Sequence, residues 1–370
     1  MFTCYIKLTN FCNVGCDFCY LPETSRADKT IMDDQTITRS VQLAEASAKS
    51  AGYKGVLYVI HGGEPLTISP KRLQDKLQFL LNETRMETAL TLQTSLIPYR
   101  TEFRDVISKY FDSFIGSSID FSGRSVSGSA TGYIDLWLKK LNTARKDGNS
   151  VTPIVVPSRN ELGRAHEIVD FMVENDLQSF NIERYNSFSS HDENRPTNGE
   201  HSQFLIELTK EVLRRHEIGV FLAVNVVVAA IKGVLKSVPG DRWGGSCTRS
   251  FLVINPDGET NFCPDKIEFS KSFGSVHSNP VQIIASDERV RVQTQHTLTH
   301  SNSYCNSCEF NSWCKTGCPI TSNKPEVDGD CSGYKTFLDW LKSQNAGTLH
   351  SYLEALKFAQ RGLLSLEDAV

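Results

Sequence analysis

Between residue 3 and about residue 215, short apolar runs alternate six times with amphipathic stretches. The apolar runs are CYIKL, GVLYVIH, ALTLQT, SFIGSSID, TPIVVPS and SFNIER, and apolar residues recur at helical spacing after each of them. A strand followed by a helix, repeated in this way, predicts a parallel sheet with right-handed crossovers, either an open sheet or a partial barrel. In such folds the chemistry gathers where the strands end.

The alternation stops after Asn225, where a different kind of structure begins. Residues 226–238 form an apolar stretch that predicts a helix, and Pro239-Gly240 mark a boundary. The run FLVINPDGETNFC predicts a β-hairpin, and the last part of the chain predicts helix. We therefore expect a core over 1–238, a small cysteine-rich domain over 239–334 and a C-terminal helical tail over 335–370.

Composition narrows the classes of partner. The net charge is −4 and the isoelectric point is about 6.2, so the chain has no basic field to hold nucleic acid or an anionic membrane. No basic and apolar leader opens the sequence, and no apolar run approaches the roughly 18 residues of a membrane span. We expect a cytoplasmic protein that binds neither nucleic acid nor a membrane.

The cysteines are concentrated in two regions. Of eleven, four precede residue 20, none lies between 20 and 246, and seven lie between 247 and 331. In a reducing compartment, clustered cysteines indicate metal or redox chemistry rather than disulfides. The distribution therefore predicts two metal regions separated by a part of the chain that has no cysteine.

Cys12, Cys16 and Cys19 form the N-terminal triplet, directly after the first predicted strand. Iron-sulfur cubes normally take one thiolate per iron, so three thiolates leave one iron open for a small molecule with nitrogen and oxygen donors. A zinc site with a distant fourth ligand is the alternative, and it fits the spacing Cys-x3-Cys-x2-Cys less well.

This triplet, with Phe18 before its last cysteine, resembles the signature of the radical S-adenosylmethionine (SAM) enzymes. The resemblance implies a partial (β/α)6 TIM barrel whose open iron chelates the methionine part of SAM, while Phe18 packs by the adenine. It also implies that electron delivery cleaves SAM to a 5′-deoxyadenosyl radical, which abstracts a hydrogen atom from the substrate.

A second family motif appears at the end of the second predicted strand. Gly62-Gly63-Glu64-Pro65 is similar to the segment in which backbone and glutamate meet the SAM amino group. Such an ammonium would pair with a carboxylate placed there. By the same resemblance, further SAM contacts are expected at later strand ends: Thr94, Ser118, Asp120, Asn160 and Arg184. Each of these five could equally be an ordinary polar loop residue.

Two of these positions depart from the family pattern. Gln93-Thr94-Ser95-Leu96 keeps only the first half of the family's Gln-Thr-Asn-Gly, and Phe121 replaces the glycine of its Ser-x-Asp-Gly. Both departures affect the rim of the expected cavity. The resemblance therefore indicates the type of reaction more clearly than it indicates the substrate.

The second cysteine set resembles the seven-cysteine pattern of the SPASM extension, including Gly258. The resemblance assigns one auxiliary iron-sulfur cluster, expected to be [4Fe-4S], to Cys305, Cys308, Cys314 and Cys331. It assigns a second, nearer to the radical site, to Cys247, Cys263 and Cys318. Two zinc sites that only brace the fold are the alternative.

The second auxiliary cluster has three assigned cysteines, one fewer than the four irons of a [4Fe-4S] cluster. Anaerobic sulfatase maturases carry an eighth cysteine a few residues after the first, and residues 248–254 contain none. The cluster therefore has either a different fourth ligand or an open iron.

Asp265 is the candidate base for the proton that oxidation releases, or else a solvated turn residue. Cys4, on the first strand, is expected to be a small core residue.

The resemblance implies a peptide maturase that forms an oxidative carbon–carbon or thioether crosslink in a ribosomally made peptide. Its expected partners are that peptide, an external electron donor of flavodoxin or ferredoxin type, and a separate leader-binding protein. The alternatives are formylglycine formation as in anaerobic sulfatase maturases, a radical dehydrogenase acting on a small molecule, and a non-catalytic iron-sulfur electron carrier.

Overall fold

The computed structural model describes residues 1–19, 21–185, 193–245, 247–261, 263, 272–299, 303–318 and 330–367. Two compact units make up the chain. The first comprises residues 1–156, 185–192 and 246–297, and the second comprises 157–184, 193–245 and 298–370. Both units combine segments that are distant in the sequence. The domain boundaries expected near residues 238 and 334 stay a prediction.

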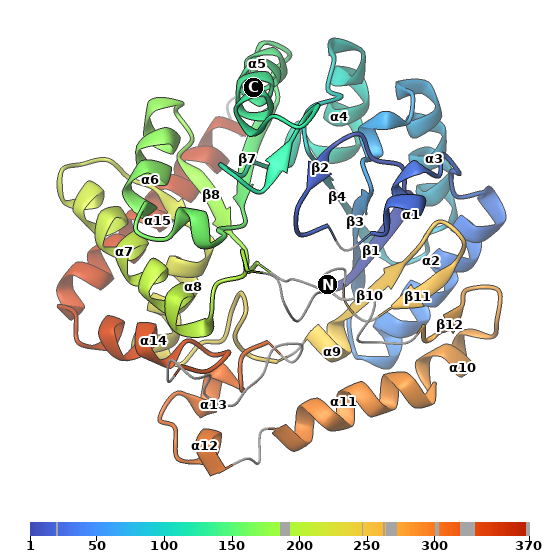
Figure 1. Cartoon of the computed structure of the whole chain (residues 1–370). Helices are drawn as coiled ribbons and strands as arrows, with labels where there is room; N and C mark the ends of the chain where they lie inside the picture. Colours follow the sequence, from blue (N-terminus) through green and yellow to red (C-terminus); the bar gives the residue numbers. More distant parts are fainter. Residues whose placement is uncertain are drawn as a thin grey trace. The chain divides into compact units, whose positions relative to one another are not determined.

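The first unit is built on a mainly parallel sheet (Figure 1), in the order β12-β11-β10-β1-β3-β4-β5-β7. Its parallel strands are β1 (Phe2–Thr9), β3 (Gly55–Gly62), β4 (Glu87–Thr94), β5 (Phe114–Ser118), β7 (Ser150–Val155) and β10 (Phe251–Ile254). β10 pairs antiparallel with β11 (Glu259–Asn261), and β11 with β12 (Gly274–Ser275). The predicted hairpin is therefore confirmed, and its first strand lies beside β1.

Helices follow the strands as the apolar spacing predicts. They are α2 (Asp34–Ser50), α3 (Pro70–Glu83), α4 (Arg104–Phe111) and α5 (Ala130–Lys146), with α10 (Pro280–Ile284) and α11 (Asp287–Thr299) later in the chain. Asp33 caps α2 by accepting a hydrogen bond from the Thr36 amide, and the predicted face of Ile37, Val41 and Ala44 is buried. The core of this unit therefore forms between the sheet and these apolar helix faces.

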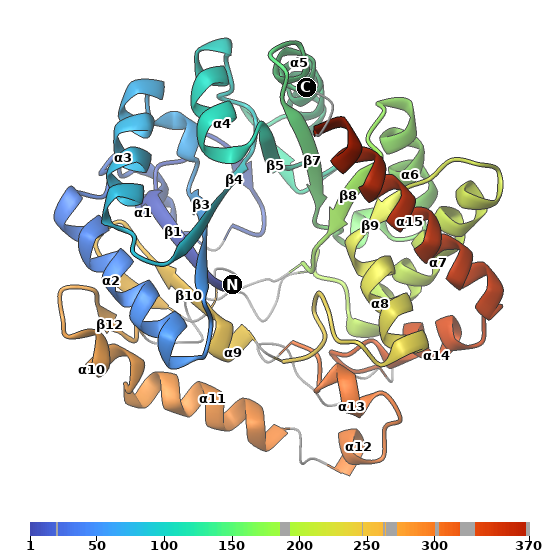
Figure 2. The same cartoon turned by 180° about the vertical axis from the view of Figure 1, so that it is seen from behind.

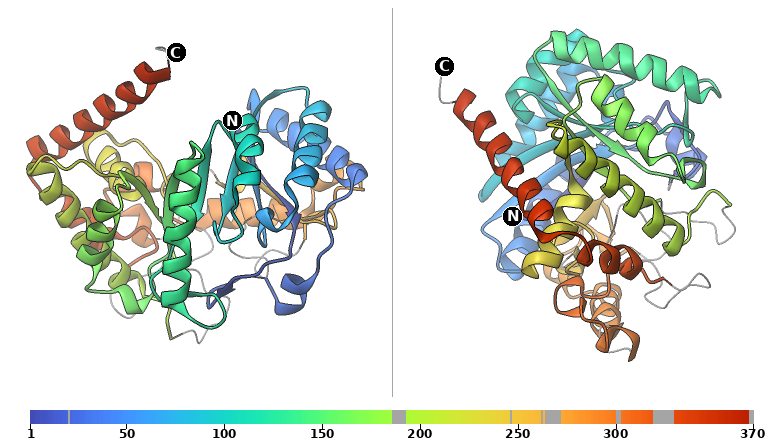
Figure 3. Two further views of the ribbon diagram at one scale, coloured as in Figure 1. Left: turned by 90° about the horizontal axis from the view of Figure 1, so that it is seen from above. Right: turned by 90° about the vertical axis from the view of Figure 1, so that its left-hand side faces the viewer.

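The second unit is mainly helical. Its strands β8 (Ser179–Ile182) and β9 (Ala223–Val224) pair in parallel. Its helices are α6 (Ala165–Glu174), α7 (Asn198–Glu217), α8 (Asn225–Lys236), α12 (Ser303–Asn306), α13 (Asn311–Cys314), α14 (Lys335–Lys342) and α15 (Ala346–Glu367). The predicted tail is helical but divided, because Asn345 accepts hydrogen bonds from the Gly347 and Thr348 amides and starts a new helix. Figures 2 and 3 show α15 running beside α7 and α8, which it contacts.

All six predicted strand-and-helix pairs are present in chain order, from β1 and α2 to β8 and α7. Within the described ranges, no helix has both the length and the apolar character that crossing a membrane requires.

Candidate functional site

The loop that carries the N-terminal cysteines is fixed by backbone pairing within the first unit. β2 (Gly15–Cys16) pairs antiparallel with β6 (Arg124–Ser125), so that Cys16 lies opposite Arg124. The Cys12 amide donates to the Arg26 carbonyl over 3.0 Å, and the Cys19 amide donates to the Cys16 carbonyl over 3.2 Å. The loop therefore has a defined shape formed by the chain itself.

The three thiols lie close enough to affect one another. Burial raises the pKa of Cys12 to about 12, and Glu64, Cys16 and Cys19 add to that rise. Burial is also the largest cause that raises the pKa of Cys16, and Cys19 contributes. Three partly buried thiols that share one loop suit an iron-sulfur cluster, whose iron ions stabilise thiolates. This donor set fits the predicted cluster.

Gly62 and Gly63 join the end of β3 to the segment that leads into Cys12. The Gly63 amide donates to the Thr9 carbonyl over 2.9 Å, and the Glu64 amide donates to the Phe11 carbonyl over 2.8 Å. A Cβ on Gly62 would lie 2.2 Å from the Thr9 carbonyl oxygen, and φ there is +144°. The glycines are therefore needed because two backbones touch at this point.

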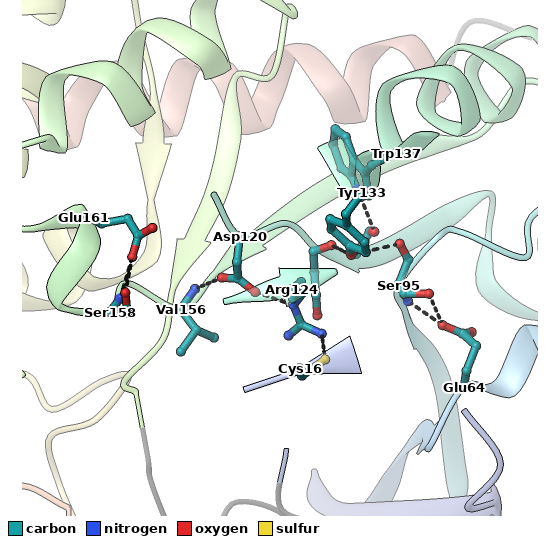
Figure 4. A network of polar contacts seen from close by, with 12 residues as sticks. Cys16, Glu64, Ser95, Asp120, Arg124, Tyr133, Trp137, Val156, Ser158 and Glu161 are labelled. Atoms are coloured by element: carbon teal, nitrogen blue, oxygen red, sulfur yellow. Dashed lines mark hydrogen bonds and ion pairs between the residues drawn. The ribbon is translucent and has the colours of Figure 1, made fainter. Parts of the chain in front are cut away.

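The Glu64 carboxylate is buried and accepts four hydrogen bonds, of which Figure 4 draws the two from Ser95. One oxygen accepts from the Thr94 hydroxyl over 2.6 Å and the Leu66 amide over 3.0 Å. The other accepts from the Ser95 amide over 2.7 Å and from the Ser95 hydroxyl. Burial raises the pKa of Glu64, while these bonds act in the opposite direction. The carboxylate thus ties the loop after β3 to the loop after β4.

Asp120 and Arg124 form the second buried polar group of this unit (Figure 4). One Asp120 oxygen accepts from the Val156 amide over 2.6 Å, and the other pairs with Arg124 Nε. Arg124 Nη1 donates to Cys16 Sγ over 3.1 Å, and the guanidinium carbon lies 5.1 Å from the centre of the Phe18 ring. The series of contacts that begins at Asp120 and passes through Arg124 thus ends at Cys16, a predicted cluster ligand.

The structure brings some predicted cofactor residues together. Phe18, Glu64, Thr94, Ser118 and Asp120 all lie in the first unit, where the Ser118 carbonyl accepts from the Tyr133 hydroxyl over 2.7 Å. Asn160 and Arg184 lie in the second unit. Asn160 is an exposed residue of a 3-10 turn, and Arg184 donates to the Ser332 carbonyl over 3.0 Å. For all seven residues, contact with SAM stays a prediction.

Sequence reasoning missed three residues of this network. Ser95 is one position beyond Thr94, where the family motif has asparagine, so its role was within reach of the sequence. Arg124 and Tyr133 follow Asp120 in a segment without any motif. Only folding places their side chains on Cys16 and Ser118.

Four of the C-terminal cysteines lie together in the second unit: Cys305, Cys308, Cys314 and Cys331. Burial raises the pKa of Cys314 to about 12, and the other three thiols add to the rise. A Cβ on Gly333 would lie 2.7 Å from Cys314 Sγ and 3.6 Å from Cys331 Sγ. Glycine therefore leaves open the space beside two thiols, and this arrangement fits the predicted distal cluster.

We expect Gly333→Ala to remove this cluster, because the added methyl group would occupy space beside Cys314 Sγ. Purified anaerobically, the variant should contain about four fewer iron atoms per chain than the unaltered protein. Gly240→Ala is the matched control, since a Cβ there would lie 3.5 Å from its nearest neighbour, an ordinary contact. Equal iron content in both variants would contradict the assignment.

The remaining cysteine predictions are less constrained. Cys247 and Cys263 lie in the first unit and Cys318 in the second, so their common cluster stays a prediction. Asp265 lies outside the described residues. Cys4 is completely buried in the core, as predicted, and burial raises the pKa of its thiol. Among the described residues, no three His, Cys, Asp or Glu side chains are arranged to hold a single metal ion.

Two arginines and a histidine lie around the Tyr334 ring in the second unit. The Tyr334 ring has the Arg184 guanidinium 4.9 Å from its centre and the Arg242 guanidinium 5.8 Å away. The His201 ring lies 4.9 Å from the Tyr334 ring, and Arg242 Nη1 lies 3.1 Å from His201 Nε2. Because the arginine can only donate, His201 is neutral with its proton on Nδ1. Burial, then Arg242 and Arg184, lower the pKa of His201 well below 6.5.

This environment predicts a pH-dependent stability. Because the folded pKa lies below the unfolded value, His201 contributes stability above about pH 6.5 that is lost as the pH falls. His201→Gln should therefore weaken the fall in unfolding free energy between about pH 7 and about pH 5, measured by chemical denaturation. His166→Gln removes an exposed histidine and is the control. An unchanged pH dependence in His201→Gln would contradict the assignment.

Comparison with known families identifies the C-terminal part. The SPASM family, described as an iron-sulfur cluster-binding domain, matches residues 246–309. The chain is 23% identical over 350 residues to the serine-type anaerobic sulfatase-maturating enzyme of Klebsiella aerogenes, covering 88% of this chain and 81% of that enzyme. A protein of Methanothermobacter thermautotrophicus without an assigned function is 27% identical over 170 residues, 45% of this chain. The match spans about three fifths of that relative, 61% of its length.

Two solved structures share the fold. Native anSMEcpe with bound AdoMet and the Cp18Cys peptide superposes with a TM-score of 0.72 at 14% identity, covering 100% of this chain and 99% of that one. Streptococcus suis SuiB bound to its precursor peptide SuiA gives 0.62 at 16% identity, covering 86% of this chain and 71% of that one.

The fold class is thus a partial (β/α)6 barrel with a C-terminal SPASM domain, as predicted. The predicted resemblance to radical SAM proteins with a SPASM extension is thus confirmed by the SPASM match over residues 246–309, by the shared fold and by the distant sulfatase-maturase relative.

Proposed function

We propose that this chain is a cytoplasmic peptide maturase that uses SAM to form an oxidative intramolecular crosslink in a ribosomally made peptide. The observation that carries the proposal is the joined pair of motifs in the first unit. Three thiols lie on one loop, and the Gly63 and Glu64 amides hold the segment that leads into it by donating to the Thr9 and Phe11 carbonyls. An electron carrier would not need this second motif beside an incomplete set of thiols.

Cys12, Cys16 and Cys19 would hold the SAM-binding [4Fe-4S] cluster, and the C-terminal cysteines would hold the two auxiliary clusters. With SAM bound, these groups supply a 5′-deoxyadenosyl radical that takes a hydrogen atom from the substrate, and an acceptor for the electron that crosslinking releases. Asp265 is the proposed acceptor of the accompanying proton. An external flavodoxin or ferredoxin would deliver the reducing electron.

The chain's own residues would shape the SAM pocket. Phe18 lies 5.0 Å from Tyr185, and this aromatic pair offers a surface for the adenine ring. The Gly62-Gly63 backbone, which the Gly63 amide fixes on the Thr9 carbonyl, would meet the SAM amino group together with Glu64. Thr94, Ser118, Asp120, Asn160 and Arg184 are the further proposed contacts, and Thr94 would act through its bond to Glu64.

A peptide substrate is supported by the bound partners of the two structural neighbours, the Cp18Cys peptide and the precursor SuiA. Formylglycine formation is the second candidate, because the Klebsiella relative is a sulfatase-maturating enzyme. The absence of an eighth cysteine in residues 248–254 favours crosslinking. A separate leader-binding protein is the proposed additional partner.

The test is anaerobic reconstitution with iron and sulfide, followed by SAM, dithionite and a synthetic peptide from the short reading frame beside the gene. We expect 5′-deoxyadenosine and a peptide that has lost two hydrogen atoms. A crosslinked peptide and a peptide with formylglycine made from serine both have this mass, so the peptide is also treated with a hydrazide and fragmented. A hydrazone would indicate formylglycine, whereas fragments that stay joined would indicate a crosslink. No 5′-deoxyadenosine under any condition would contradict both candidates and favour an electron carrier.

A further inference from the structure

Arg124 is held in one orientation by three different contacts. Its side chain is 13% exposed, and the Asp120 side chain that pairs with its Nε is 2% exposed. Asp120 is fixed in turn by the Val156 amide. The guanidinium carbon lies 5.1 Å from the centre of the Phe18 ring. Nη1 donates to Cys16 Sγ over 3.1 Å, as Figure 4 shows.

The backbone around Arg124 supports this orientation. Cys16 and Arg124 are register partners in the β2–β6 pair. The Asp17 amide donates to the Gly123 carbonyl over 3.0 Å and continues the pairing by one residue. A Cβ on Gly15 would lie 2.7 Å from Ser125 Oγ, so glycine permits the two strands to approach. Arg124 is therefore positioned from its main chain as well as from its side-chain partners.

We propose that Arg124 is a positioning residue that makes the N-terminal cluster easier to reduce by donating a hydrogen bond to the Cys16 sulfur. The inference rests on the proposed function, in which Cys16 is a cluster ligand. One-electron reduction adds negative charge to the cube and its sulfurs, without a proton. A donor on a ligand sulfur stabilises the reduced form more than the oxidised form and so raises the reduction potential.

Because Asp120 pairs with Arg124, the proposed effect of Arg124 on the cluster is that of a local hydrogen bond and not that of a net positive charge. The Asp120 carboxylate lies on the Nε side of the guanidinium and balances the positive charge, so the ion pair has little net charge seen from a distance. What remains at the sulfur is a directed N–H donor at 3.1 Å. Lysine would keep the charge but not the forked geometry that serves Asp120 and Cys16 together.

The experiment is a redox titration of the reconstituted full chain, followed by electron paramagnetic resonance. The cluster of interest is the one whose reduced signal changes when SAM is added, which separates it from the auxiliary clusters. We expect Arg124→Met to lower its reduction equilibrium constant about tenfold, equivalent to about 59 mV for one electron. Arg124→Lys should lower it by less. Arg104→Met, which removes an exposed arginine of the same unit, should leave it unchanged.

Iron content is measured for each variant, and if Arg124→Met does not load the cluster, Arg124→Lys decides. Potentials equal to that of the unaltered protein would overturn the inference. So would weaker SAM binding at an unchanged potential, which would instead make Arg124 a direct SAM contact. If SAM changed no cluster signal of the unaltered protein, the proposed function would be wrong, and this inference with it.

Discussion

Replacing Cys12 with alanine is expected to abolish the formation of 5′-deoxyadenosine, by at least about 1,000-fold relative to the unaltered protein. Three thiolates leave one iron of the cube open for SAM, whereas two would leave a second iron without a protein ligand. Cys12 is the thiol whose pKa burial raises to about 12, and its amide is fixed on Arg26. The variant therefore loses a proposed cluster ligand, while the rest of the loop remains.

The measurement is chromatography of reactions that contain SAM and dithionite, together with iron analysis of each protein. Cys4→Ala is the matched control, because Cys4 is buried in the core and lies on the preceding strand. It should keep full activity and lose about 1–2 kcal/mol of stability at most. Normal 5′-deoxyadenosine formation by Cys12→Ala would show that the triplet does not hold the reactive cluster.

The second large effect is expected from Glu64→Ala, which should lower the free energy of unfolding by about 3–5 kcal/mol. Truncation leaves four donors without their acceptor in a buried place: the Thr94 hydroxyl, the Leu66 amide, and the amide and hydroxyl of Ser95. Because the Glu64 side chain ties two strand-end loops together, the loop after β3 should also be less well fixed on the loop after β4. SAM binding should weaken as a result.

Urea denaturation followed by circular dichroism measures the first effect, and SAM titration of the reconstituted protein measures the second. Glu64→Gln keeps the size of the side chain but removes part of its capacity to accept hydrogen bonds. Its amide nitrogen would face donors and cannot accept from them. It should therefore remain destabilised despite its similar size. Glu102→Ala, with a side chain 68% exposed, is the control. A Glu64→Gln variant as stable as the unaltered protein would show that the four bonds contribute little.

Much of this architecture could be predicted because it depends on local patterns. Ile37, Val41 and Ala44 recur at helical spacing, and this is sufficient to place them on the buried face of α2. Asn255-Pro-Asp-Gly predicts the turn between β10 and β11 because glycine at 258 tolerates φ of +85°. What could not be predicted is that β10 pairs with β1, since this pairing joins Thr3 to Phe251 across most of the chain.

The candidate site also combines features that the sequence predicts with contacts that only the structure shows. The cysteine spacings and Gly62-Gly63-Glu64 indicated the chemistry from sequence, because ligand types at short spacing are constrained by the group they hold. For Glu64, contact with an ammonium group stays a prediction, and what the sequence did not indicate is that its oxygens accept from Thr94, Ser95 and Leu66. Hydrogen-bond partners of a buried carboxylate depend on which loops fold onto it.

Local sequence patterns were thus sufficient to predict the order of strands and helices, the two cysteine regions and the class of cofactor. The tertiary structure decided which polar groups meet: Glu64 with Ser95, and Arg124 with Cys16. The physical reason is distance along the chain. Helical spacing and ligand spacing are set by neighbours a few residues apart, whereas the Arg124 contact joins residues 108 positions apart and exists only after β2 and β6 pair.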